Sequence, residues 1–210
     1  MKKININTWE RRAHYEYFMQ MDQPQYMMTF DIDVTALVSF VKRHQLSFYL
    51  TMIHQVLSVS NQLEAFKYRI VDKEVYLCET IHVLFTDMMK QSDLFKLVYT
   101  TYEKDLHAFI KQAKEASDKQ HVFIHRDDEV LIDKIYITSF PWASYTQCSH
   151  ATYLSKYDAV PKISWGQFRW LHGRYIMPLS FSVHHGFIDG IHIAQFLETL
   201  QLKLENLEKM

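Results

Sequence analysis

The segment KISWGQFRWLHGRYIMPLSFSVHH, residues 162–185, carries two strand-like runs with only His172 and Gly173 as a turn between them. This pattern predicts a β-hairpin whose second arm ends at a pair of histidines. Strand-like runs at 66–71 and 74–79 also follow one another without a helix between them. Because parallel neighbours need a long crossover connection, the pattern argues against a purely parallel, doubly wound sheet.

Helical periodicity marks the segments around these strands. We expect helices at 7–20, 35–45, 49–63, 92–120 and 190–210, and further strands at 26–34, 81–87 and 134–140. Thr8 is the expected N-cap of the first helix, and Ser92 or Asp93 that of the long helix. The chain has no internal repeat or Pro/Ser-rich linker, so we expect one domain, residues 1–210. Its predicted class is α/β, a two-layer sandwich in which a mixed, mostly antiparallel sheet packs against helices.

Charge and cysteine content argue against several classes of function. The formal net charge is -1, which offers no electrostatic attraction to nucleic acid or to an anionic membrane. Cys78 and Cys148 are the only cysteines, too few for a disulfide framework or a cysteine-rich metal site. The N-terminal MKKININTWERR lacks the apolar core of a signal peptide, and no apolar run approaches the roughly 18 residues of a membrane span. We expect a cytoplasmic protein without nucleic-acid or membrane partners.

The motif HHGFIDG, residues 184–190, is the strongest pointer to chemistry. All four glycines of the chain fall in its last quarter, where we expect the unusual backbone geometry. Because successive strand side chains point to opposite faces, His184 and His185 cannot both face one pocket if the strand reaches them. With no H-x-x-x-H pattern or cysteine cluster nearby, we expect no metal. A single histidine acting as general base, with Asp189 fixing the local backbone, remains the favoured interpretation.

The surroundings of this motif resemble the chloramphenicol acetyltransferase family of CoA-dependent acyltransferases. HHGFIDG fits the pattern H-H-x-x-x-D-G, and HHGFIDGIHIAQFLETLQ is similar to that family's C-terminus. TWERRAHYEYF resembles its tryptophan-x-arginine helix, and LSFYLTMIHQVLSVSN its second helix. FPWASYT resembles its asparagine-proline-tryptophan-x-serine segment, with Phe140 in place of the asparagine. The matches occur in order from about residue 7 to the end, so the resemblance implies the acyltransferase fold along the whole chain.

The resemblance also implies catalytic roles. His185, the second histidine of the pair, would take the proton from an acceptor hydroxyl while that oxygen attacks the thioester carbonyl of acetyl-CoA. Asp189 would pair with Arg11, for which Arg12 is the adjacent alternative, and would hold the histidine loop in shape. Ser144 would donate a hydrogen bond to the oxyanion, where one lost donor costs roughly 10²–10³ in kcat.

Five further positions concern the reaction and its co-substrate. Ser164 stands where the resembled family carries a threonine that holds a water near the intermediate. Tyr49 and Phe168 match aromatic positions that contact CoA, although both could be core residues. Ser47 and Gln167 occupy positions where family members often carry lysines near the 3′-phosphate, which leaves the mode of CoA binding open.

The implied acceptor pocket contains Phe18, Tyr26 and Phe95. Leu97 stands where the resembled family favours a smaller residue, so we expect a narrower pocket at that point. Chloramphenicol is the first acceptor that the resemblance suggests, with another small alcohol or a polyamine-like molecule as alternatives. Acetyl-CoA would be the co-substrate, and no metal is expected.

The resemblance further implies a homotrimer whose active sites lie between subunits. Several alternatives remain open from the sequence. One is a dihydrolipoyl-type acyltransferase core, which shares the histidine motif, and another is a catalytically weak relative with a different acceptor. A third is a non-catalytic binding protein that retains the fold. The last is an interaction protein that uses the predicted 92–120 helix as a partner surface.

Overall fold

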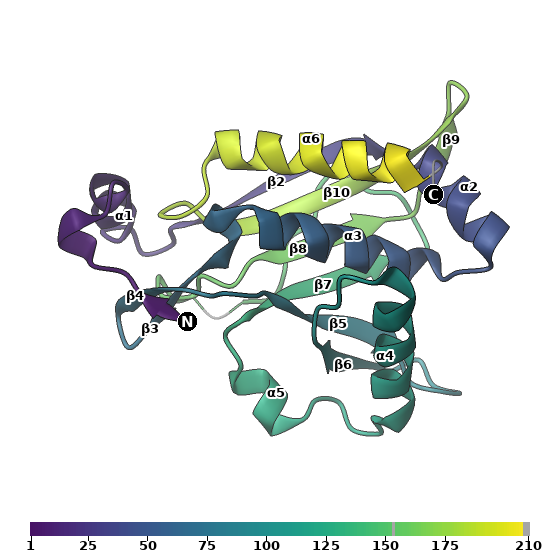
Figure 1. Ribbon diagram of the computed structural model, residues 1–210, viewed down its shortest axis with the longest axis horizontal. Coiled ribbons are helices and arrows are strands. Elements are labelled where there is room, and N and C mark those ends of the chain that lie inside the picture. The colour runs from purple at the N-terminus through teal and green to yellow at the C-terminus, as the bar shows by residue number, and fades with distance from the viewer. Residues whose placement is uncertain (153, 208–210) are drawn as a thin grey trace.

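A seven-stranded sheet forms the centre of the computed structural model, which describes residues 1–152 and 154–207 (Figure 1). Its order is β2-β10-β8-β7-β5-β6, and β9 pairs with the start of β10. The strands are β2 (Gln25–Asp33), β5 (His82–Met88), β6 (Phe95–Thr100), β7 (Lys134–Phe140), β8 (Lys162–Gly166), β9 (Arg169–Leu171) and β10 (Arg174–His184). Only the β5–β7 and β7–β8 pairs are parallel, so the prediction of a mixed, mostly antiparallel sheet is confirmed.

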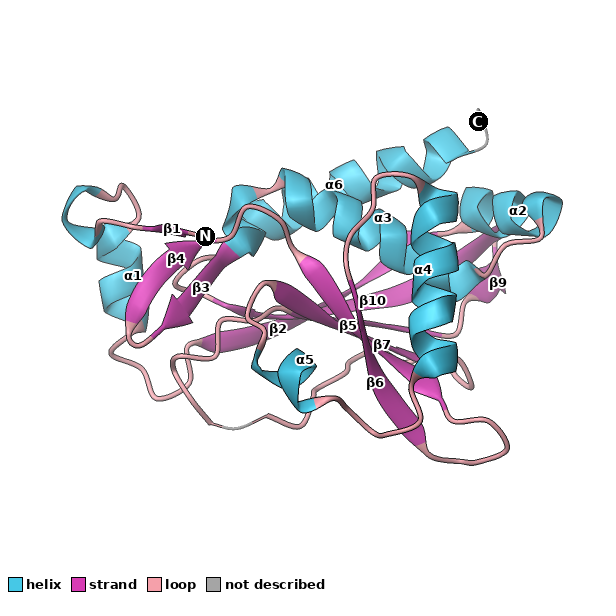
Figure 2. Ribbon diagram, turned by 60° about the horizontal axis from the view of Figure 1, so that its bottom comes forward, coloured by secondary structure: helices cyan, strands magenta, loops and turns pink. Residues whose placement is uncertain are grey.

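Four helices form a layer on one face of this sheet (Figure 2). They are α2 (Thr35–His44), α3 (Phe48–Gln62), α4 (Leu106–Lys119) and α6 (Gly190–Asn206). The smaller elements are a three-stranded sheet of β1 (Lys2–Lys3), β4 (Glu74–Leu77) and β3 (Tyr68–Val71), the helices α1 (Arg12–Phe18) and α5 (Arg126–Val130), and two 3-10 turns at Ile6–Thr8 and Glu64–Lys67. Within the described residues, no helix has the length and apolar character needed to cross a membrane.

The core lies between the helix layer and the sheet. Phe196 of α6 packs against Phe181 of β10 and Phe66, with ring centroids 5.1 Å and 4.8 Å away. Helix α3 runs between α6 and α4 and is buried through most of its length, including polar residues such as His54 and Gln55. The core therefore fixes α6, and with it the turn that joins α6 to β10.

The predicted helix at 92–120 is wrong in about its first half, since α4 covers Leu106–Lys119. Strand β6 occupies Phe95–Thr100, and helix α4 begins only after Asp105, whose side chain accepts from the backbone N–H of Ala108. The burial of β6 alternates, with Lys96 and Val98 buried, which is the period-2 pattern of a strand. Lys96 also donates to backbone oxygens at the end of α4, and this contact could not be predicted from the sequence. The hypothesis of a partner surface on one continuous 92–120 helix is therefore wrong, because that helix is not formed.

The first predicted helix is also shorter than expected. Residues Ile6–Thr8 form a 3-10 turn, and α1 starts at Arg12, so Thr8 is not its N-cap. Arg11 holds the N-cap position but makes no side-chain cap. Its guanidinium is directed to the far end of the chain instead.

The predicted hairpin in residues 162–185 is present. His172 and Gly173 form its turn with φ angles of 48° and 82°, in the left-handed region that favours glycine. Strand β10 then runs for 11 residues to His184 and delivers the histidine pair to the margin of the sheet.

Phe196→Ala tests how α6 is anchored. We expect a loss of about 3–5 kcal/mol in the free energy of unfolding, because a fully buried ring is removed from an aromatic cluster. Leu202→Ala on the same helix is the matched control, since Leu202 is 55% exposed, and should cost less than about 0.5 kcal/mol. Urea unfolding measures both, and equal costs would contradict this description of the core.

Candidate active site

The turn after β10 sends the two adjacent histidines in different directions. His184 is buried, with Nε2 3.0 Å from the carbonyl oxygen of Lys156 and Nδ1 accepting from the backbone N–H of Gly186 at 3.0 Å. Because Nε2 then carries the proton, the ring is held neutral, and burial is the main cause that lowers its pKa. His184 is therefore a structural anchor for the turn.

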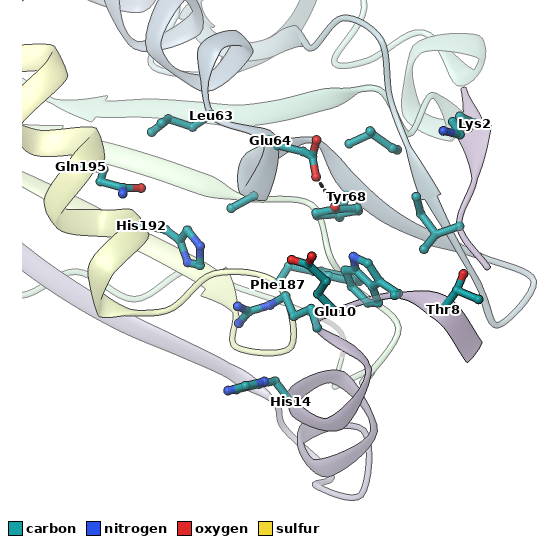
Figure 3. A pocket seen from close by; sticks show the side chains of 15 residues that line it. Lys2, Thr8, Glu10, His14, Leu63, Glu64, Tyr68, Phe187, His192 and Gln195 are labelled. Carbon is teal, nitrogen blue, oxygen red and sulfur yellow. Dashed lines mark hydrogen bonds between the residues drawn. The ribbon is translucent and has the colours of Figure 1, made fainter. Parts of the chain in front are cut away.

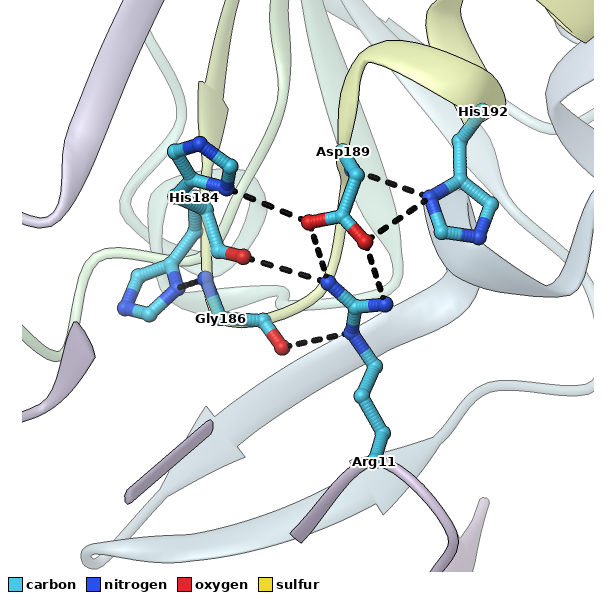
Figure 4. A network of polar contacts seen from close by, with 6 residues as sticks. Arg11, His184, Gly186, Asp189 and His192 are labelled. Atoms are coloured by element: carbon cyan, nitrogen blue, oxygen red, sulfur yellow. Dashed lines mark hydrogen bonds and ion pairs between the residues drawn. The ribbon is translucent and has the colours of Figure 1, made fainter. Parts of the chain in front are cut away.

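Arg11, near the N-terminus of the chain, forms hydrogen bonds to the same turn (Figure 4). Its guanidinium donates to both carboxylate oxygens of Asp189, at 2.8 Å and 2.6 Å, which is a bidentate ion pair. It also donates to the carbonyl oxygens of Gly186 at 2.8 Å and His185 at 3.3 Å. The expected alternative, Arg12, points elsewhere and pairs with Glu16. The structure thus brings Arg11 and Asp189 together directly.

His185 lies between this ion pair and two aromatic rings. Its Nδ1 is 3.2 Å from Oδ1 of Asp189, and because a carboxylate only accepts, Nδ1 is assigned the proton. Phe18 stacks on the imidazole with centroids 4.0 Å apart, and Tyr26 lies 4.4 Å away on a tilted ring. The side chain is 35% exposed, so solvent can reach the ring. In the neutral tautomer that carries its proton on Nδ1, the other nitrogen, Nε2, is a hydrogen-bond acceptor.

Asp189 is stabilised as a carboxylate. Burial alone raises its pKa, but the hydrogen bonds and charge of Arg11 act in the opposite direction, and the net pKa is lowered. Asp189 is also the N-cap of α6, where the helix dipole favours negative charge. Its backbone N–H donates to Nδ1 of His192 at 2.9 Å. His192 therefore completes the turn, a role that the sequence motif alone did not identify.

A row of hydroxyl side chains crosses the open face of the sheet, opposite the helix layer. Thr29 and Ser180 are hydrogen-bonded at 2.7 Å, and Thr86 and Thr138 at 2.9 Å. Ser164 pairs with Ser180 on one side and Thr138 on the other, so it occupies the middle of the row. Both Ser164 and Ser180 are buried.

Ser144 lies beside this row. The hydroxyl of the next residue, Tyr145, is 3.4 Å from Oγ of Ser164. The carbonyl of the preceding residue, Ala143, accepts from the backbone N–H of Gln167 at 2.9 Å. These contacts fix the backbone on either side of Ser144 against the end of β8, and Ser144 itself is partly exposed.

The two groups of candidate residues are far apart within one chain. Ser164 is in register with Ser180, five positions before His185 along β10. At about 3.4 Å per residue, the offset along the strand is about 17 Å. The structure therefore unites His185, Asp189 and Arg11, and separately Ser144 and Ser164, but does not join the two groups.

The residues expected to bind the reactants also fall into two separate groups, one beside His185 and one at a different cavity. Phe18 and Tyr26 lie against His185, whereas Tyr49 and Phe95 line a separate cavity of about 550 Å³. Leu97 belongs to strand β6, not to a helix as expected. It pairs with Thr86, and its position on the open-face side is consistent with the burial pattern of β6.

The positions expected to bear on CoA binding have structural partners. Phe168 packs between Phe48 and Tyr175, with centroids 5.2 Å from each. Ser47 accepts from the backbone N–H of Leu50 as the N-cap of α3, so its hydroxyl is used in the helix start. The side chain of Gln167 is exposed.

A cavity of about 700 Å³ lies on the His192 side of the ion pair (Figure 3). Arg11, Glu10, His14, Phe187 and His192 line it together with residues of the small sheet. His185 is not part of its wall. Across the described residues, no three His, Cys, Asp or Glu side chains gather as a metal site would require.

A sequence model of chloramphenicol acetyltransferases matches residues 1–201 of this chain. The chain belongs to the chloramphenicol acetyltransferase family. As a member of this family, it is an acyltransferase. Chloramphenicol acetyltransferase 2 of Escherichia coli is 28% identical over 210 residues, which cover 99% of this chain and 98% of that protein.

Solved structures support the fold of this family member. A chloramphenicol acetyltransferase superposes with a TM-score of 0.88 at 24% identity, over 97% of this chain and 99% of that one. The cubic core of the pyruvate dehydrogenase multienzyme complex superposes with a TM-score of 0.69 at 16% identity, over 94% and 88% of the two chains. At these identities, the likeness establishes the fold alone.

A double-mutant cycle measures the ion pair in this chloramphenicol acetyltransferase family member. Arg11→Gln and Asp189→Asn should show a coupling energy of about 0.5–3 kcal/mol in the free energy of unfolding near neutral pH. Because the folded pKa of Asp189 is lowered, this coupling is present above the unfolded carboxyl pKa of about 3.9 and is lost as pH falls through the folded pKa. A coupling that does not change on acidification would contradict the assignment.

Gly186→Ala tests the packing of the turn. An added Cβ would lie 2.8 Å from Cε1 and 2.9 Å from Nδ1 of His184, whose ring cannot retreat because both nitrogens are hydrogen-bonded. We expect a loss of about 1–3 kcal/mol in the free energy of unfolding. Gly190→Ala is the matched control, since a methyl group added there would meet no neighbouring side chain within 4 Å. Equal unfolding midpoints in urea would rule out this steric account.

Proposed function

We propose that the chain is an acetyl-CoA-dependent O-acetyltransferase that acetylates a hydroxyl of chloramphenicol or a related small acceptor. The observation that carries the proposal is the geometry of His185, whose Nδ1 lies 3.2 Å from the carboxylate of Asp189 and whose ring is partly exposed. The match to the chloramphenicol acetyltransferase family supports both the reaction class and the first acceptor to test.

In the proposed reaction, Nε2 of His185 accepts the proton of the acceptor hydroxyl. The oxygen attacks the carbonyl carbon of acetyl-CoA, the new C–O ester bond forms, and the C–S bond breaks. The proton held by His185 then passes to the leaving thiolate, so the products are an acetate ester and free CoA thiol. A general base of this kind contributes about 10²–10⁴ to the rate. Asp189 and Arg11 position the imidazole and do not touch the reactants.

The oxyanion donor is proposed to be Ser144, supported by Ser164. Since Ser164 lies about 17 Å along the strand from His185 within one chain, and the neighbours of Ser144 contact Ser164 and the end of β8, we infer that a second copy supplies both serines. A homotrimer with active sites between subunits is the assembly that we propose. Closed cyclic symmetry gives every site the same two contributing surfaces.

The reactant contacts follow from this arrangement. Tyr49 and Phe168 are proposed to contact CoA, and Phe18 and Tyr26 to line the acceptor site beside the base. Phe95 and Leu97 are proposed to complete the acceptor site from the other subunit. We expect the protein to act in the cytoplasm, where its free Cys78 and Cys148 would remain reduced.

Substitutions at His185 and Ser144 test the proposed chemistry. With acetyl-CoA and chloramphenicol, His185→Ala should lower kcat by about 10²–10⁴, because no base remains to take the hydroxyl proton. Ser144→Ala should retain a measurable rate that is lower by about 10²–10³, because one oxyanion donor is lost. Release of free thiol measures both, and wild-type turnover by His185→Ala would refute the base assignment.

Mixing the two variants tests whether His185 and Ser144 act in one site from two different subunits or from the same chain. Co-expressed His185→Ala and Ser144→Ala chains should regain activity, since random assortment gives about a quarter of the sites both native residues. The recovered rate should exceed that of either variant alone. Activity in an isolated monomer, or no recovery in mixed trimers, would contradict the intersubunit site.

A further inference from the structure

The cavity that contains Tyr49 and Phe95 has a distinct chemical character. It encloses about 550 Å³ between the ends of β5 and β7, the loop before β6 and the segment that follows β7. Its wall includes three aromatic rings, from Tyr49, Phe95 and Trp142. The hydroxyl of Tyr49 is held by the backbone carbonyl of Thr86 at 2.9 Å, which fixes that ring in the wall.

The charge of this cavity is acidic. Asp87 and Asp93 line it, and none of the described lining residues is Lys, Arg or His. Asp93 is exposed and has no ion-pair partner among the residues that the structure describes. Asp87 accepts from the hydroxyl of Ser117 and the backbone N–H of Met88, while the nearby Lys96 ammonium is used by carbonyl oxygens of α4. Asp93 is therefore the carboxylate that a ligand could neutralise.

Two of the aromatic rings are exposed at the same place. Trp142 is 66% exposed and Phe95 is 47% exposed. Aromatic faces attract cations, tryptophan most strongly, and exposed rings next to a free carboxylate form a site suited to an ammonium group. The same carboxylates disfavour the phosphates of CoA, so the cavity suits a cation better than the nucleotide end of CoA.

The cavity adjoins the proposed oxyanion donor. Pro141 and Trp142 in its wall lead directly to Ser144, and Thr138 belongs to the hydroxyl row that contains Ser164. A molecule whose hydroxyl reacts near Ser144 could therefore place a second group in this cavity.

We propose that the preferred acceptor carries a protonated amine in addition to the hydroxyl that is acetylated. The ammonium lies between Asp93 and the rings of Trp142 and Phe95. This inference rests on the proposed function. The reaction is the one proposed above: the hydroxyl proton passes through His185 to the CoA thiolate, and the ammonium group stays protonated throughout.

Two acceptors that differ mainly in charge test the proposal. Chloramphenicol is neutral, whereas the aminodiol left after removal of its dichloroacetyl group carries an ammonium beside the same primary alcohol. Thiol release, with NMR of the product to distinguish the ester from the isomeric amide, should give a kcat/KM for O-acetylation of the aminodiol at least about tenfold above that of chloramphenicol. Asp93→Asn should lower this preference about tenfold, because the charged hydrogen-bond acceptor is lost.

Asp127→Asn provides the matched control. Asp127 is an exposed aspartate on α5 that does not line this cavity, so the preference between the two acceptors should stay at the wild-type value. A preference for chloramphenicol, or a preference that Asp93→Asn does not change, would overturn the ammonium site while the proposed function stood.

Calorimetric binding without acetyl-CoA separates this inference from the reaction. The aminodiol should bind the wild-type protein about tenfold more tightly than the Asp93→Asn variant. If it does so while neither acceptor releases thiol, the ammonium site stands and the proposed acetylation fails. Equal binding to both proteins would overturn the ammonium site whatever the turnover.

Discussion

The bidentate ion pair between Arg11 and Asp189 is the interaction on which the rest of the site depends. It joins the first helix to the turn before the last one, and the same guanidinium also donates to the carbonyl oxygens of His185 and Gly186. Arg11 makes four hydrogen bonds in this arrangement, more than the three donors of a lysine ammonium could supply, so lysine would not be an equivalent residue. The chain thus fixes the turn that carries His185 through a contact between its two ends, which no local propensity could provide.

The orientation of His185 is a consequence of that contact. Arg11 favours the ionised form of Asp189, and this carboxylate accepts a hydrogen bond from the Nδ1–H of His185, which directs Nε2 away from the ion pair as an acceptor. The stacked ring of Phe18 then limits rotation of the imidazole. His184 has the opposite environment, because its two nitrogens meet a carbonyl oxygen and an amide inside the protein. The two adjacent histidines therefore have different hydrogen-bond partners and different exposure, because strand alternation and the following turn direct their side chains to different places.

Strand alternation and turn chemistry were readable from the sequence, whereas contacts between distant segments were not. The hairpin at His172 and Gly173 was predictable because a glycine turn separated two alternating runs. The error at 92–120 arose because the strand Phe95–Thr100 directly precedes α4, so its apolar residues could be counted with the helix. The hydroxyl row around Ser164 was also missed, since single Ser and Thr residues on five strands reveal nothing until register aligns them. The motif resemblance supplied Arg11 and Asp189 as a pair, but their geometry needed the structure.

The separation of His185 from Ser144 follows from the geometry of the sheet and not from the conformation of a loop. Ser164 is held in the middle of the sheet by its register with Ser180, while His185 comes after the end of β10. Closing an offset of about 17 Å within one chain would require breaking the β8–β10 ladder, and the core under α6 opposes that. Chemistry that uses both residues therefore favours a second copy of the chain. The same division would place the base at one wall of a shared site and the acidic, aromatic cavity at the other, so a two-ended acceptor could meet both.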